Sequence, residues 1–262
     1  MSEPLCRITN LTIRYAGHET PALEKLTLDL KAGERLAIVG ESGSGKSTFV
    51  RALAGLLPDG AVQYGEIQWA ANESPKLGRD LGFVFQDTSA SLNPVLRIGE
   101  QVAEGARHHL GMPWSSAYQH ALQLLEHVRI PNAAAAMHAY PHQLSGGQRQ
   151  RVAIAAAIAS RPSILIADEA TSALDTVVQA EIVGLLDDLV NEHAMTLIFV
   201  THDIALASNL ADRIAVFKDG RLVEIGTASD ILTDPASDYT RSLITGHYDL
   251  STPPLVTSVL GS

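Results

Sequence analysis

The sequence predicts an α/β fold, in which a mixed sheet with helices on both faces carries an N-terminal antiparallel β subdomain and an inserted α-helical subdomain. Three observations predict it. An apolar strand at 36–39 leads through a glycine-rich loop into a helix that begins near Thr48. Polar and apolar residues alternate over residues 5–31, and residues 96–160 show helical spacing without strand signals.

Composition narrows the class of protein. The 262 residues carry a net charge of −10, which argues against a nucleic-acid partner because phosphate binding leaves a basic footprint. The single cysteine, Cys6, excludes an internal disulfide framework and a cysteine-rich metal site. The N-terminus has no signal-peptide pattern, and no stretch approaches about 18 uninterrupted apolar residues. We therefore expect a soluble, cytosolic chain without a membrane span.

The N-terminal strands are predicted by alternation of polar and apolar residues. Residues 5–15 and 26–30 show this period of two, which is typical of antiparallel strands with one face in water. Two further strands are indicated at 65–69 and 81–85, on either side of a polar connection.

The glycine-rich loop is the strongest chemical signal. Its residues are Gly40, Glu41, Ser42, Gly43, Ser44, Gly45, Lys46, Ser47 and Thr48. The glycines allow a tight turn with N–H groups pointing inward, and the helix N-terminus adds partial positive charge. Lys46 is placed to reach terminal phosphates, and the Ser47 hydroxyl to hold Mg²⁺. The pattern predicts a nucleotide-binding P-loop.

The helical insertion is predicted to contain helices over Ile98–Leu110, Ser115–Val128 and Gln148–Ala159, with Ser115 as the N-cap of the second. Just before the third helix, Ser145-Gly146-Gly147 forms a second glycine-rich helix start, where N–H groups again point at an anion. Four histidines of this insertion lack the spacing of metal ligands, namely His108, His109, His138 and His142.

A buried strand over Ile164–Asp168 ends in two carboxylates. Asp168 can hold Mg²⁺, directly or through water, and Glu169 can orient the water that attacks the γ-phosphate. Acidic residues closing a strand are often only turn residues, but the phosphate loop upstream favours the chemical interpretation. Ser172 to Asp175 form a turn that starts a helix reaching about Glu192.

Three single residues have a structural and a functional interpretation. Tyr15, at a strand end ahead of the loop, can stack on an adenine ring or pack across strands. Gln86 follows the strand at 81–85, where a glutamine is usually a surface residue. His202 follows a buried strand at 195–200, at the end where α/β proteins bind ligands, or it neighbours a helix cap. Position alone favours the structural interpretation of Tyr15 and Gln86.

The C-terminal part is expected to form a hairpin of residues 214–217 and 221–225, followed by short helices near 228–233 and 236–245. Residues 249–262, with two adjacent prolines, indicate a loose tail.

No linker divides the chain, so residues 1–248 are expected to form one domain. Its antiparallel β part is assigned to residues 1–39 with 62–85, and its helical insertion to residues 96–160.

The full set of motifs, in this order, resembles the ATP-binding subunit of an ABC transporter over residues 1 to about 245. The P-loop is the Walker A motif, Gln86 the Q-loop residue, and Leu144 to Gln148 an intact Leu-Ser-Gly-Gly-Gln signature. Ile164 to Asp168 match Walker B, and Glu169 its catalytic carboxylate. The remaining matches are Ser172 to Asp175 as the D-loop, His202 as the switch histidine and Tyr15 as the adenine-stacking aromatic.

The resemblance implies a mechanism and partners. A second ABC ATPase subunit would pair head to tail with this one, so that each ATP lies between Lys46 of one subunit and Ser145, Gly146, Gly147 and Gln148 of the other. Asp175 would join that site, and Gln86 would sense Mg²⁺ and the γ-phosphate. His202 would contact the γ-phosphate, and hydrolysis at Glu169 would open the dimer. The family's subunits dock on two membrane permease subunits at the cytoplasmic face of the inner membrane and work with a solute-binding protein.

A narrower resemblance is to the oligopeptide, dipeptide and nickel importer subfamily. It is carried by Gln86 to Pro94, by Tyr140-Pro141-His142-Gln143 and by Asp238 to Leu243. Ala170 stands where many members carry proline. The absence of a cysteine-bearing C-terminal extension favours nickel or a metallophore as the expected substrate. The resemblance to this subfamily also implies that the partner ATPase is a different chain.

Two other functions remain open at this point. A soluble ABC ATPase outside transport would be expected to carry two cassettes or a long coiled-coil insertion. A regulatory subunit that binds ATP without turnover would be expected to have lost Glu169, His202 or the signature, and all three are present.

Overall fold

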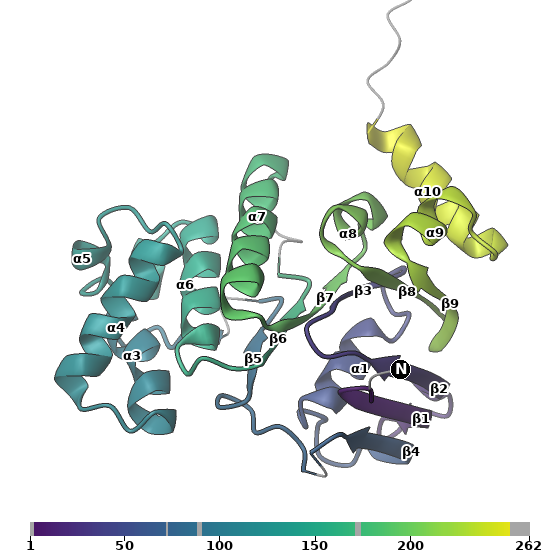
Figure 1. Cartoon of the computed structure of the whole chain (residues 1–262), viewed down its shortest axis with the longest axis horizontal. Helices are drawn as coiled ribbons and strands as arrows, with labels where there is room; N and C mark the ends of the chain where they lie inside the picture. The colour runs from purple at the N-terminus through teal and green to yellow at the C-terminus, as the bar shows by residue number, and fades with distance from the viewer. Residues whose placement is uncertain (1–2, 72, 88–90, 171–173, 252–262) are drawn as a thin grey trace, which may run out of the picture.

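The computed structural model describes residues 3–71, 73–87, 91–170 and 174–251. It contains a three-stranded sheet in the order β2-β1-β4 and a six-stranded sheet in the order β5-β6-β7-β3-β8-β9 (Figure 1). The strands are β1 Cys6–Arg14, β2 Leu23–Leu30, β3 Arg35–Val39, β4 Val62–Trp69, β5 Leu81–Val84, β6 Ile164–Asp168, β7 Thr196–Thr201, β8 Arg213–Lys218 and β9 Arg221–Thr227. The helices are α1 Lys46–Leu53, α3 Ile98–His109, α4 Trp114–His127, α5 Ala133–Ala136, η1 Pro141–Gln143, α6 Gly146–Ile158, α7 Thr176–His193, α8 Ile204–Leu210, α9 Ala228–Thr233 and α10 Asp238–Ser251.

The large sheet is parallel from β5 to β8, and β9 adds an antiparallel edge. The strands from β5 to β8 consist mostly of buried residues, and since successive side chains point to opposite sides, both faces of this part of the sheet are covered. In β3, Leu36 and Ile38 enter the core shared with the small sheet, while Ala37 and Val39 enter the core under the helices. The fold class and the mixed sheet predicted from the sequence are confirmed.

Helix α1 lies between the two sheets. Phe49 and Val50 are fully buried in a core that also holds Ile8, Leu26 and Phe217, and the rings of Phe49 and Phe217 lie 5.6 Å apart. This packing fixes the helix whose first turn carries Lys46 and Ser47 at the carboxyl ends of β3 and β6.

The antiparallel part is narrower than expected. Only β1, β2 and β4 form it, whereas residues 35–39 and 81–84, which the sequence analysis placed there, are strands of the large sheet. Both strands consist mainly of buried residues rather than alternating ones, which is the pattern of a sheet covered on both faces.

The helical insertion forms a bundle of α3 to α6 at one end of the large sheet, left in Figure 1. The prediction that Ser115 caps α4 is wrong, since the helix begins at Trp114 with Pro113 as its N-cap residue. Proline holds a backbone angle suited to a helix start without contributing a side-chain hydrogen bond.

At the C-terminal end, α10 continues to Ser251 and so includes residues 249–251, which had been expected in the loose tail. Residues 252–262 lie outside the described part. Within that described part, none of the helices is both long enough and apolar enough to cross a bilayer.

Candidate nucleotide site

The phosphate loop joins β3 to α1 and depends on its glycines. Gly40 has φ 150°, and a Cβ there would lie 2.2 Å from the carbonyl oxygen of Phe217. Gly45 has φ 97°, and a Cβ there would lie 2.6 Å from the carbonyl oxygen of Ala22. Only glycine fits such close approaches. The backbone of β8 and of the residue before β2 therefore leaves no room for a side chain at these two positions of the loop.

Lys46 lies inside the loop with a side chain that is 3% exposed. Its ammonium group donates to the carbonyl oxygens of Gly40 and Glu41, each at 2.8 Å, and lies 3.7 Å from Glu169 Oε1. Burial lowers the pKa of Lys46, and the nearby Glu169 opposes that shift. A buried cation held by two carbonyls and a carboxylate can move to an incoming phosphate, which offers stronger charge-assisted bonds.

Asp168 and Ser47 meet where the sequence predicts a Mg²⁺ site. Ser47 Oγ donates to Asp168 Oδ1 at 2.8 Å. The other oxygen, Asp168 Oδ2, is buried and has no hydrogen-bond partner among the described residues. An orphaned carboxylate oxygen beside a hydroxyl is a donor set that Mg²⁺ prefers, and so these two residues fit the ion. Burial raises the pKa of Asp168, as expected for a carboxylate whose charge lacks a partner.

We expect Asp168→Asn to raise the stability of the nucleotide-free chain while removing the Mg²⁺ dependence of ATP binding. The folded-state pKa of Asp168 lies above its ordinary value, so the charged carboxylate destabilises the fold as pH rises through that range. The gain should be about 1 kcal/mol at neutral pH and should shrink as pH is lowered toward 4, because protonation removes the buried charge from wild-type Asp168. Chemical denaturation of both proteins at neutral pH and near pH 4 measures this gain in stability. An Asp168→Asn protein that is less stable than wild type at neutral pH would contradict the prediction.

Glu169 follows β6 in a left-handed conformation with φ 47°, which is unusual outside glycine, and its N–H donates to Val200 O. This turn points its carboxylate at the loop, where Gln86 Nε2 donates to Glu169 Oε2 at 2.7 Å. The two residues come from neighbouring strand ends, since β5 pairs with β6. Backbone strain of this kind gathers at functional sites.

Tyr15 and His202 lie at the margins of the loop. Tyr15 and Thr48 share a hydrogen bond of 3.0 Å between their hydroxyls, and Tyr15 and Gly43 line one open pocket of about 810 Å³. That pocket has room for a base and ribose beside the loop. His202 is exposed and directly follows Thr201, which pairs with Val39 at the end of β3. Its backbone position therefore lies at the same sheet edge as the loop.

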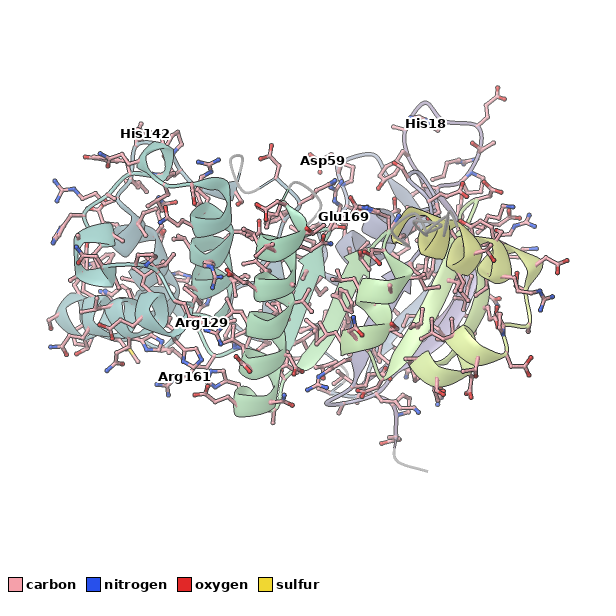
Figure 2. All side chains as sticks on the ribbon, turned by 90° about the horizontal axis from the view of Figure 1, so that it is seen from above. His18, Asp59, Arg129, His142, Arg161 and Glu169 are labelled. Carbon is pink, nitrogen blue, oxygen red and sulfur yellow. The ribbon has the colours of Figure 1, made fainter. Side chains whose placement is uncertain are left out.

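The signature residues form the predicted helix start, but they lie apart from the phosphate loop. Ser145 caps α6: Ser145 Oγ accepts from the N–H of Gln148, and Gln148 Oε1 accepts from the N–H of Ser145. Helices α6 and α1 lie in different parts of the molecule (Figure 1), while His142, just before the signature, lies toward the same edge as Glu169 (Figure 2). The chain therefore carries two glycine-rich helix starts, at α1 and at α6, in different parts of the molecule.

The described end of the D-loop lies beside the signature of the same chain. Asp175 caps α7 by accepting from the N–H of Val178, and an added Cβ on Gly147 would lie 2.8 Å from Val178 Cγ1. Ser172 and Ala173, which are also predicted D-loop positions, lie outside the described residues.

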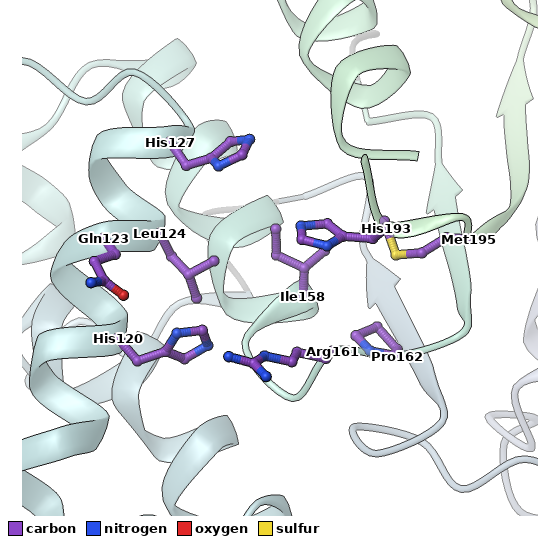
Figure 3. A pocket seen from close by; sticks show the side chains of 9 residues that line it. All are labelled: His120, Gln123, Leu124, His127, Ile158, Arg161, Pro162, His193 and Met195. Carbon is purple, nitrogen blue, oxygen red and sulfur yellow. The ribbon is translucent and has the colours of Figure 1, made fainter. Parts of the chain in front are cut away.

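A pocket of about 320 Å³ lies elsewhere, at the seam between the helical insertion and the large sheet (Figure 3). It is lined by His120, His127, His193 and Arg161, and Arg161 lies toward the edge opposite His142 (Figure 2). His127 and His193 stand in the last turns of α4 and α7, where basic groups stabilise helix ends, and His127 lies 3.1 Å from Glu192. No group of three or more His, Cys, Asp or Glu within the described ranges could hold a metal ion. These basic groups therefore fit a structural role.

Comparison with known proteins decides the family. The family model described as ABC transporter matches residues 23–172, more than half of the chain. The chain belongs to the ABC transporter family.

Curated members of this ABC family resemble the chain over most of its length. The oligopeptide transport ATP-binding protein OppD of Bacillus subtilis is 40% identical over 92% of this chain and 71% of its own. The peptidoglycan transport ATP-binding protein YejF of Agrobacterium fabrum is 39% identical, over 96% of this chain and 50% of its own. The glutathione import ATP-binding protein GsiA of Salmonella typhimurium is 41% identical, over 90% and 40%. The chain thus spans about half or less of the length of YejF and GsiA.

Solved ABC cassettes share the fold. The ATP-binding cassette MJ0796, solved as a dimer in a post-hydrolysis state bound to ADP and Pi, is 33% identical, covers 85% of this chain and has a TM-score of 0.74. CbiO1 of Clostridium perfringens, part of the ABC transporter complex cbiONQ, is 28% identical over 96% of this chain, with a TM-score of 0.75.

One residue of this ABC cassette that contacts the phosphate loop was not predicted from the sequence. Tyr239 of α10 accepts a hydrogen bond from the N–H of Glu41 at 3.2 Å. The segment Asp238 to Leu243 had been noted only as a subfamily resemblance, and no local pattern relates it to a loop that lies so far away in the sequence.

Proposed function

We propose that the chain binds ATP with Mg²⁺ at the Lys46 loop and hydrolyses it. The observation that carries this is the convergence of Lys46, Ser47, Asp168 and Glu169 at one end of β3 and β6, with Gln86 bonded to Glu169. Separate stretches of sequence supply these groups, and the fold brings them within hydrogen-bonding or ion-pair reach of one another.

Each residue then has a task. The loop N–H groups and Lys46 hold the β- and γ-phosphates, and Tyr15 receives the adenine ring. Mg²⁺ held by Ser47 and Asp168 would neutralise charge on the phosphate oxygens. Glu169 orients the attacking water and accepts its proton, while Gln86 holds the Glu169 carboxylate until substrate is in place. His202 contacts the γ-phosphate from the neighbouring strand end.

The second half of the site comes from another ABC ATPase subunit, as the separation of α6 from α1 favours. In a head-to-tail pair, the N-terminus of α6, with Ser145, Gly146, Gly147 and Gln148, approaches the γ-phosphate held by the partner, and Asp175 lies at the same junction. The cassette MJ0796, similar over most of this chain, was solved as a dimer, which supports the pairing of two subunits.

The pair drives an importer. Its partners are two membrane permease subunits and, indirectly, a solute-binding protein, with the cassettes at the cytoplasmic face of the inner membrane. The names of the curated relatives support short peptides or peptide-like molecules such as glutathione as the transported class. Nickel, expected from the length of the chain, gains no support from these names, and it enters the test below as the other outcome.

Uptake tests the transport assignment. Cells that carry Lys46→Ala in place of the wild-type chain should lose uptake of a labelled dipeptide and keep uptake of labelled nickel. Loss of nickel uptake alone would instead make this a metal importer, and retention of both would reject both substrate classes.

A further inference from the structure

The start of α10 is fixed by one carboxylate of the β8–β9 hairpin. Glu224 Oε2 accepts from the Thr240 hydroxyl at 2.6 Å and from the N–H of Ser237 at 3.1 Å, and Oε1 accepts from the N–H of Ala236 at 2.7 Å. Thr240 is fully buried. Three bonds to one side chain hold the first turn of α10, and hence the neighbouring Tyr239, in a defined place.

From that place Tyr239 reaches the phosphate loop. Its hydroxyl accepts from the N–H of Glu41 at 3.2 Å, and Lys218 Nζ lies 4.6 Å from the centroid of its ring. The ring packs on the core beneath the helices. Ring and hydroxyl therefore have different surroundings: the ring joins α10 to the hairpin and core, and the hydroxyl joins α10 to the loop.

The same peptide group is held from both sides. The N–H that Tyr239 accepts and the carbonyl of Gly40, to which Lys46 donates at 2.8 Å, belong to the peptide between Gly40 and Glu41. Hydrogen bonds at the two ends of one peptide polarise each other and fix its plane. If Lys46 gives up this carbonyl when it reaches for a phosphate, the Tyr239 hydroxyl still holds the other side of the peptide.

We propose that Tyr239 is a positioning residue for the phosphate loop and that, through it, α10 is coupled to nucleotide binding. This inference rests on the proposed ATP binding at Lys46. Tyr239 acts through the Gly40–Glu41 peptide and does not touch the nucleotide. Because coupling between two sites is reciprocal, bound nucleotide should in turn steady the start of α10.

Tyr239→Phe isolates the hydroxyl, since it keeps the ring and its contact with Lys218. We expect the dissociation constant for Mg-ATP, measured by titration calorimetry on the full chain, to rise about fivefold, the typical effect of one neutral hydrogen bond. The melting temperature of the nucleotide-free chain should fall by no more than about 2–4 °C, the shift expected for the loss of one neutral hydrogen bond in a chain of this size. Tyr64→Phe is the matched control, because Tyr64 is exposed on β4 and should leave both quantities unchanged. Wild-type affinity in Tyr239→Phe would overturn the inference.

Hydrogen exchange adds a readout that a packing role would not change. In the wild-type chain, Mg-ATP should slow amide exchange over residues 238–246, and in Tyr239→Phe saturated with Mg-ATP this extra protection should be absent. Equal protection in both proteins would contradict the coupling. Failure of the wild-type chain to bind ATP would instead contradict the proposed function, which separates the two failures.

Discussion

Glu169→Gln is expected to keep ATP binding and to lose about 10²- to 10⁴-fold in turnover, the range that a positioned general base contributes. The amide has the shape of the carboxylate, so it can still bond to Gln86, but it cannot accept a proton from water. Since hydrolysis is what separates the paired subunits in the proposed cycle, the variant should also remain in an ATP-stabilised pair with its partner cassette.

Single-turnover hydrolysis and light scattering with Mg-ATP measure the two effects. Glu126→Gln provides the control, because Glu126 is an exposed residue of α4 in the helical insertion and should behave as wild type. Turnover at the wild-type rate in Glu169→Gln would remove Glu169 from its role as base.

Lys46→Ala is expected to abolish measurable ATP binding, with a loss of affinity of about a hundredfold or more. Lys46 offers charge-assisted hydrogen bonds to the terminal phosphates, each contributing about 1.5–3 kcal/mol, and it makes them from a buried position where screening by water is small. Alanine also removes the two bonds that hold the carbonyls of Gly40 and Glu41.

Titration with Mg-ATP checks this, with the melting temperature recorded to show that the variant is folded. Lys31→Ala is the matched control, since Lys31 is exposed in the turn before β3. A folded Lys46→Ala protein with wild-type affinity would show that the loop is not the phosphate site.

The core of the fold and the local motifs could be predicted because each depends on residues that are close together in the sequence. The strand, loop and helix around Gly45 and the carboxylates that end β6 depend on short-range periodicity and on residue types at fixed spacing. The capping box of Ser145 and Gln148 is local in the same way. Sheet membership was harder to predict, because strand pairing joins segments far apart in the sequence, as β5 and β6 show.

The contacts that tie the site together could not be predicted for the same reason. Gln86 bonds to Glu169, and Tyr239 to Glu41, across long stretches of chain. The error at Ser115 has a different origin. A good capping residue stood in the expected place, but Pro113 started α4 earlier.

In the proposed cycle, each ATP is held by the Lys46 loop of one subunit and by the signature of another. Gly146→Asp tests it most directly, because a Cβ added there would make only an ordinary van der Waals contact, with Leu174 Cδ2 at 3.8 Å. The new carboxylate would repel a phosphate approaching the N-terminus of α6. For Gly146→Asp we expect unchanged ATP affinity in the isolated chain and a loss of about a hundredfold in the ATPase activity of the assembled transporter. Weakened ATP binding by the isolated chain, or full activity of the assembly, would contradict it.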